Sequence, residues 1–187
     1  MIKLVAAPVI ASTVLLGTTS AIAEEGGMTN ETAYMYAKGQ KTGPINGSVT
    51  QKGRENSIQV LDVRHSIVSP RDPQSGLPTG PRQHKPFVIT KEIDKASPLL
   101  EQVLCTNENL TSVTLKFWTL QAAAGVGSEV QHYTITLTNA NIASIDIKPE
   151  MIGGKEVLVE QISFTYQKIE WVWPNGGITA VDTWGAR

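Results

Sequence analysis

Residues 162–173, ISFTYQKIEWVW, decide the fold class. Up to Tyr166 the apolar residues alternate with polar ones, which is the period of a β-strand that buries one face. The alternation resumes out of phase at Ile169. A slip of one residue would turn every following side chain to the other face, so we predict a β-bulge near residues 167–168.

Alternation of the same kind predicts strands on the N-terminal side of this stretch and one after it. They cover residues 34–38, 57–68, 85–90, 113–118, 132–137 and 145–147, and a short last strand ends at Trp184. The phase also slips within 57–68, where we predict another bulge near residues 60–61. About seven or eight strands at this spacing are typical of a mainly β protein, an antiparallel barrel or sandwich.

One helix is predicted beside these strands. Ser97 is its expected N-cap, because a serine hydroxyl can accept a hydrogen bond from a free amide of the first turn. Pro98 suits the first helical position, where its missing N–H is no loss. The apolar residues that follow at helical spacing are Leu99, Leu100, Val103 and Leu104, and the helix is expected to end at residues 106–107.

The first residues are interpreted as a targeting segment. Lys3 precedes an apolar run from Leu4 to Leu16, which is too short to span a bilayer, and Ala21-Ile22-Ala23 fits a signal-peptidase site. We therefore expect a signal peptide at 1–23, a linker at 24–32 and one domain at 33–187. An uncleaved membrane-tethering helix is the alternative for the first segment.

Composition excludes several function classes. Sixteen basic residues against seventeen acidic ones give a net charge of −1, so the basic face that nucleic-acid binding or an anionic membrane requires is not expected. No later segment has the length of a membrane span, so no stable membrane insertion is expected. A single cysteine permits no internal disulfide and no multi-cysteine metal site.

A search for catalytic motifs predicts a protein that is not an enzyme. The chain has no glycine-rich phosphate loop and no nucleophile elbow, and its three histidines lack metal-ligand spacing. No catalytic, metal or cofactor residue is therefore predicted, and no cofactor, although paired carboxylates stay open at this level. His65 is interpreted as a hydrogen-bonded core histidine, and Cys105 as a buried, inert thiol.

The tryptophans leave two interpretations open. Trp171 and Trp173 share a strand face with Ile169, which favours burial in the core or at a subunit interface. Exposed tryptophans would instead form a glycan-binding platform. The second interpretation gives the alternative function, a secreted or periplasmic β-sandwich binding module.

The loop between Ser69 and Lys85 is unusually long for a compact domain. Four prolines stiffen it, at positions 70, 73, 78 and 81, and it carries several charged side chains. A stiff, charged, protruding loop suits contact with another chain, because little entropy is lost when it docks. The alternative is a flexible surface loop that has no partner.

Several ordered motifs resemble the haemolysin-coregulated (Hcp) proteins, the tube subunits of type VI secretion systems. They begin in the long loop with Ser69-Pro-Arg-Asp-Pro, Ser75-Gly-Leu-Pro-Thr-Gly and Arg82-Gln-His-Lys-Pro. They continue with Ile89-Thr-Lys-Glu, Asp94-Lys-Ala-Ser-Pro, Tyr133-Thr-Ile-Thr-Leu-Thr-Asn-Ala, Ile162-Ser-Phe-Thr-Tyr-Gln-Lys-Ile-Glu and Asp182-Thr-Trp184. The resemblance covers nearly all of residues 33–184.

The resemblance implies a β-barrel that assembles as a homohexameric ring, with rings stacked into a tube that carries effectors and is itself exported. The implied partners are other copies of the chain and the sheath, spike and effector proteins of the secretion system. The family's extended loop contacts other subunits, and in this chain the role falls on Arg71, Asp72, Thr79, Arg82, Gln83, His84 and Lys85.

The signal-like segment departs from the family pattern, because tube subunits are normally loaded from the cytoplasm. Two explanations stay open. The chain passes through the periplasm by its signal peptide and is secreted, or translation starts at Met28 and assembly takes place in the cytoplasm.

Overall fold

A computed structural model describes residues 31–123 and 126–185 of the chain. The predicted signal peptide and most of the predicted linker lie outside these residues. The mainly β class with one helix is confirmed, with eleven strands in the described part. They are β1 Thr32–Gly39, β2 Gly43–Ile45, β3 Ile58–Val60, β4 Asp62–Arg64, β5 Ile67–Val68, β6 Gln83–His84, β7 Phe87–Glu92, β8 Leu110–Ala123, β9 Val126–Ile152, β10 Lys155–Trp173 and β11 Ile178–Thr183, and the helix is α1 Ser97–Cys105.

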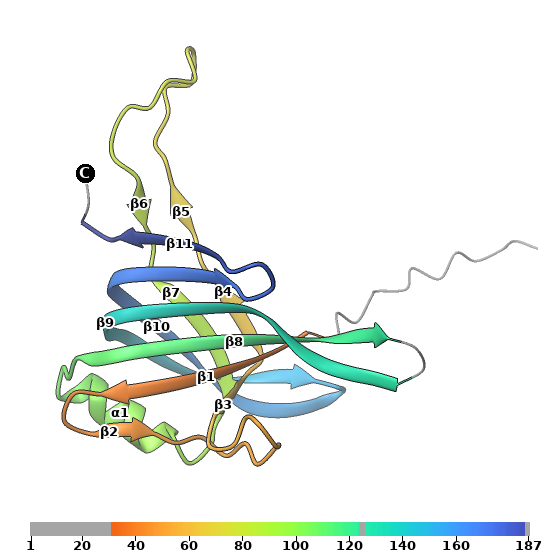
Figure 1. The fold of residues 1–187 in the computed structure, drawn as a ribbon. Coiled ribbons are helices and arrows are strands. Elements are labelled where there is room, and N and C mark those ends of the chain that lie inside the picture. The colour runs from red at the N-terminus through yellow and green to blue at the C-terminus, as the bar shows by residue number, and fades with distance from the viewer. Residues whose placement is uncertain (1–30, 124–125, 186–187) are drawn as a thin grey trace, which may run out of the picture.

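Nine strands form one antiparallel sheet in the order β2-β1-β8-β9-β10-β7-β4, with β3 added to β1 and β11 added to β10. The sheet curls around the core (Figure 1). Two segments predicted as separate strands, 132–137 and 145–147, belong to the single long strand β9. Because β9 and β10 pair over most of their length, they form the main wall of the protein.

The segment 57–68 was predicted as one bulged strand, and this prediction is wrong. Residues 58–60 pair with β1, whereas residues 62–64 pair with β7. Leu61, at the phase slip, lies between the two strands, and its N–H donates to the carbonyl of Thr90 at 2.8 Å. The slip therefore marks a change of partner strand. Among the described strands no pair closes the barrel, and this one segment links the two edges of the curled sheet.

The bulge predicted in β10 near residues 167–168 is not found at that position. The β9–β10 register shifts between Ser163 and Phe164 and is unchanged on either side of Gln167. The irregularity at this level lies in β9, where Asn139 has a φ of 49° and donates from its side-chain amide to Gln167 at 2.8 Å. The phase change itself is real, since Tyr166 and Ile169 are both buried.

The sequence correctly predicts the helix but not its cap. Helix α1 begins at Ser97, its N-cap position is Ala96, and Thr106 is its C-cap. The Ser97 hydroxyl accepts instead from the Asp94 N–H and from Lys91 Nζ, each at 3.0 Å. The turn into the helix is held by Asp94, whose Oδ1 accepts from the Ala96 N–H at 3.0 Å.

The core is apolar along alternate strand positions and is completed by the helix. Fully buried side chains include Phe87, Ile162, Phe164 and Ile169, and α1 adds Leu100. Cys105, predicted to be buried, is exposed at the end of α1, because the helix turns this position away from the core.

A close backbone approach at Gly47 gives a testable prediction. A Cβ atom at this buried position would lie 2.2 Å from the Ser57 carbonyl oxygen and 2.6 Å from the Ile58 Cα. Because backbone atoms cannot move aside as a side chain can, Gly47→Ala is expected to lower the free energy of unfolding by about 1–3 kcal/mol. Gly80→Ala is the matched control, since a Cβ there meets nothing within 4 Å. Equal urea midpoints for the two variants would contradict this packing.

Candidate functional site

The long loop is a narrow two-stranded arm, which comprises residues 67–84. Its base is the β5–β6 pair, in which Ile67 opposes His84 and Val68 opposes Gln83. Further out, Arg71 and Pro78 form a β-bridge, and the Thr79 N–H donates to the Pro70 carbonyl at 3.0 Å. Figure 1 shows the arm standing away from the curled sheet.

The tip of the arm is an ordered turn built around Asp72. The Asp72 Oδ1 accepts from the Gln74 N–H at 3.1 Å and from the Ser75 N–H and hydroxyl at 2.7 and 2.8 Å. These hydrogen bonds lower the pKa of Asp72, because they stabilise its ionised form. Arg71 donates from Nη1 to the Gly76 carbonyl at 3.1 Å. The tip therefore has a fixed shape although it is exposed.

The base of the arm is fastened to the last strand. Arg82 forms a bidentate pair with Asp182 of β11, which matches the fork geometry that guanidinium and carboxylate prefer. These hydrogen bonds lower the pKa of Asp182. The buried His84 lies 3.2 Å from the same carboxylate through Nε2 and stacks on Trp184 with ring centroids 5.6 Å apart.

A tyrosine of the main wall completes the base. The Tyr166 hydroxyl of β10 lies 2.9 Å from His84 Nδ1 and 2.8 Å from His65 Nε2. His65 precedes β5, so both strands of the arm are held by the same hydroxyl. His65 is hydrogen-bonded, as predicted, but it is only half-buried.

The seven predicted loop residues therefore separate into three groups. Arg82 and His84 contact the curled sheet at the base of the arm. Arg71, Thr79 and Gln83 are exposed along the arm, and Lys85 is exposed just after it. Asp72 organises the tip. Three residues of the base were missed as site residues, namely His65, Tyr166 and Asp182. No sequence spacing links these three residues to residues 82–84. Of the three, Asp182 and Tyr166 lie in motifs that carried the resemblance, whereas His65 does not.

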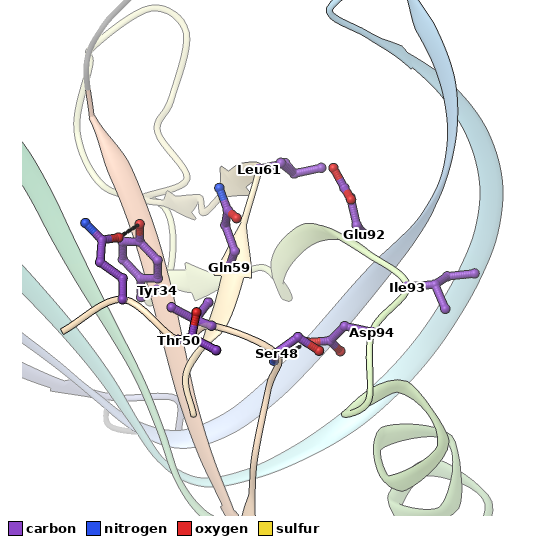
Figure 2. Close-up of a pocket in the computed structure, with 10 residues that line it drawn as sticks. Tyr34, Ser48, Thr50, Gln59, Leu61, Glu92, Ile93 and Asp94 are labelled. Atoms are coloured by element: carbon purple, nitrogen blue, oxygen red, sulfur yellow. Dashed lines mark hydrogen bonds between the residues drawn. The ribbon is translucent and has the colours of Figure 1, made fainter. Parts of the chain in front are cut away.

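A hollow in the described surface lies at the other end of β7 from the arm (Figure 2). It has a volume of about 450 Å³ and is bordered by the loop 48–51, by β3 and by residues 92–94. Its polar groups serve the fold: the Tyr34 hydroxyl donates to Gln51 at 3.0 Å, and Asp94 accepts from the Ser48 N–H at 3.1 Å. The arrangement provides no paired nucleophile and base.

The described residues also bear on metal binding and on membrane crossing. Residues 31–123 and 126–185 contain no group of three or more His, Cys, Asp or Glu side chains that could hold a metal ion. Within the same ranges, no helix is long and apolar enough to cross a membrane.

The tryptophans form no exposed platform in this part of the chain. Trp118 lies under the Arg54 guanidinium, 4.0 Å from its Cζ, and Trp184 stacks on His84. Trp171 packs against the core, and only Trp173 is more than a third exposed, at 43%. This arrangement fits the burial interpretation better than glycan binding.

The fold and the site together define a protein with one curled antiparallel sheet, whose distinctive feature is a projecting arm. Comparison with known proteins gives the same class. Residues 34–173 match the family model described as "Type VI secretion system effector, Hcp". The chain is 39% identical over 167 residues to the "Major exported protein" of Pseudomonas aeruginosa PAO1, covering 81% of this chain and 94% of that one.

Solved structures agree with this match. The Hcp1 protein of E. coli EAEC 042 is 33% identical, with a TM-score of 0.71 over 82% of this chain and 98% of that chain. The secreted protein Hcp3 of Pseudomonas aeruginosa is also 33% identical, with a TM-score of 0.66 over 83% and 99%. The chain belongs to the Hcp family, and it is a tube subunit and exported protein of the type VI secretion system.

Proposed function

We propose that the chain assembles into hexameric rings, that the rings stack into a tube, and that the arm contributes contacts between copies. The observation that carries the proposal is the arm itself, which projects from the barrel with a fixed tip and a fastened base. A rigid projection loses little entropy on docking, so its exposed side chains can contribute to association.

Exposed apolar side chains and free strand edges support the same proposal. Edge strand β11 pairs with β10, and no other described strand pairs with its second edge. Its Ile178 is 66% exposed, and at the far ends of β9 and β10 Met151 and Leu158 are 66% and 54% exposed. Burial against neighbouring copies would remove these side chains from water and cover the edge, as closed rings of identical subunits require.

The proposed role is structural, with no catalysis and no cofactor. The partners we propose are other copies of the chain and the sheath, spike and effector proteins of the secretion system. Neither nucleic acid nor a membrane is among the proposed partners, since a net charge of −1 does not favour binding to phosphate groups.

For localisation we propose export, with residues 1–23 as a signal peptide, 24–32 as a linker and 33–187 as the barrel domain. Translation from Met28, with assembly in the cytoplasm, is the competing account. N-terminal sequencing of the native protein separates them: a terminus at Glu24 supports processing, whereas a terminus at Met28 supports the internal start.

Lysine-reactive cross-linking tests the ring. The expected product is a ladder that ends at six copies, and Arg71→Glu, which reverses an exposed charge near the arm tip, is expected to reduce the largest product about threefold or more. The control is Arg64→Glu, which reverses an exposed charge on β4 and leaves every reactive lysine in place. If the parent chain gives monomer alone, with no cross-linked product, the proposed ring is contradicted.

A further inference from the structure

Two histidines, one just before the first strand of the arm and one on its second strand, share one tyrosine hydroxyl. His65 and His84 both lie within hydrogen-bonding distance of the Tyr166 oxygen, at 2.8 and 2.9 Å. Burial, with a smaller contribution from the Asp182 charge, raises the pKa of Tyr166 to about 12. The hydroxyl therefore keeps its single hydrogen throughout the pH range in which histidines titrate, and it can donate to only one of the two rings.

The contact with Asp182 fixes which ring nitrogen carries hydrogen when both rings are neutral. His84 Nε2 faces a carboxylate, so it must be the donor, and Nδ1 is left to accept from Tyr166. The Tyr166 oxygen then accepts from His65 Nε2. One uninterrupted chain of hydrogen bonds thus runs from the first strand of the arm, through the barrel wall, to the second strand and β11.

Protonation changes this arrangement in two steps. If one ring gains a proton, the Tyr166 hydrogen can point to the other, neutral ring. Both hydrogen bonds between Tyr166 and the two histidines are then kept. If both rings are charged, each presents an N–H to Tyr166, whose hydrogen then has no acceptor among them. Two positive charges would also lie on either side of one hydroxyl, with Arg82 close by.

We propose that this cluster, formed by His65, Tyr166 and His84, is an acid-sensitive latch that holds the arm at neutral pH and releases it when both histidines are protonated. The latch lies wholly within one subunit. It therefore goes beyond the proposed ring and does not depend on ring formation.

The charges around the cluster include one ionised carboxylate. Hydrogen bonds from Arg82 lower the pKa of Asp182 below its ordinary value of 3.8, so this carboxylate is ionised near neutral pH. Neighbouring elements also carry Arg82, Lys85, the Arg64–Asp62 pair and the Lys168–Glu170 pair. The Asp182 carboxylate, already bound to Arg82, contacts the His84 imidazole.

The sign of the pH dependence follows from His65. Burial, and secondarily the charge of His84, lowers its pKa below the ordinary 6.5. Because the pKa of His65 is lowered while the arm is attached, the released form of the protein binds a proton at His65 more readily. Attachment of the arm is therefore fully present above pH 6.5, weakens as the pH falls through that value and continues to weaken down to the lowered pKa.

Hydrogen exchange on the purified full chain tests the latch. Protection factors of the base amides, such as the Lys85 N–H that donates to the Ser66 carbonyl at 3.0 Å, are measured from about pH 7.5 to about pH 5.0. A fall of about tenfold or more is expected in the parent chain. His132→Gln, which removes the remote third histidine, is expected to show the same fall.

Two variants make the outcome decisive. His65→Gln keeps a hydrogen-bonding group but cannot be charged, so its protection is expected to change less than about twofold over the range. Tyr166→Phe removes the shared hydroxyl, so low protection at every pH is expected. Amides shared by β8 and β9 report whether each variant is folded. A parent chain with no pH dependence, or a Tyr166→Phe variant with the parent's profile, would overturn the proposal.

Discussion

Replacing Lys91 with methionine is expected to lower the free energy of unfolding by about 3–5 kcal/mol, because it leaves carboxylates unpaired inside the protein. Lys91 is fully buried, and its Nζ lies 2.8 Å from Glu160 Oε2 and 3.0 Å from Asp94 Oδ1. It also donates to the Ser97 hydroxyl. The ammonium therefore joins β7 and β10 to the start of α1.

Urea unfolding at neutral pH measures this loss. The matched control is Lys148→Met, which removes a half-exposed lysine 3.6 Å from Glu150 and is expected to cost less than about 1 kcal/mol. The double variant Lys91→Met/Glu160→Leu is expected to recover part of the loss, since it removes the unpaired charge with its partner. Equal midpoints for the two single variants would show that the Lys91 network does not stabilise the fold.

Arg82→Glu is expected to detach the arm from its base and to reduce the assembled fraction by about tenfold or more. The substitution places a second carboxylate against Asp182, in contact with His84. The arm then loses its bidentate pair, and the fixed geometry that docking needs is lost with it. Native mass measurement gives the assembled fraction, and hydrogen exchange of the base amides shows whether the arm is detached.

The charge-swapped variant Arg82→Glu/Asp182→Arg is the control for Arg82→Glu. It restores an opposite-charge pair at the same place, so both the base protection and the assembled fraction are expected to recover in part. Normal assembly of Arg82→Glu alone would show that the base of the arm is not required for association.

The sequence predicts those features that depend on local periodicity. The alternation around Tyr166 gives the long strand β10, and Pro98 with its following leucines gives α1. The four prolines of residues 69–85 identify the arm. In each case the signal lies within one segment, because it reflects which face of that segment is buried.

Features that depend on partners distant in sequence were misplaced or missed. The slip at residues 60–61 looks the same for a bulge and for a change of partner strand. Ser97 is a plausible cap until the Lys91 ammonium is placed beside its hydroxyl. The base of the arm joins Arg82 to Asp182, 100 positions later, so no local pattern could reveal it.

The most direct test of the central claim is native mass measurement of the purified chain together with electron microscopy of the same sample. A mass of six copies and annular particles, which extend into stacks at high concentration, are the expected result. A single copy at every concentration, with no rings in the images, would contradict self-association as the way this protein works.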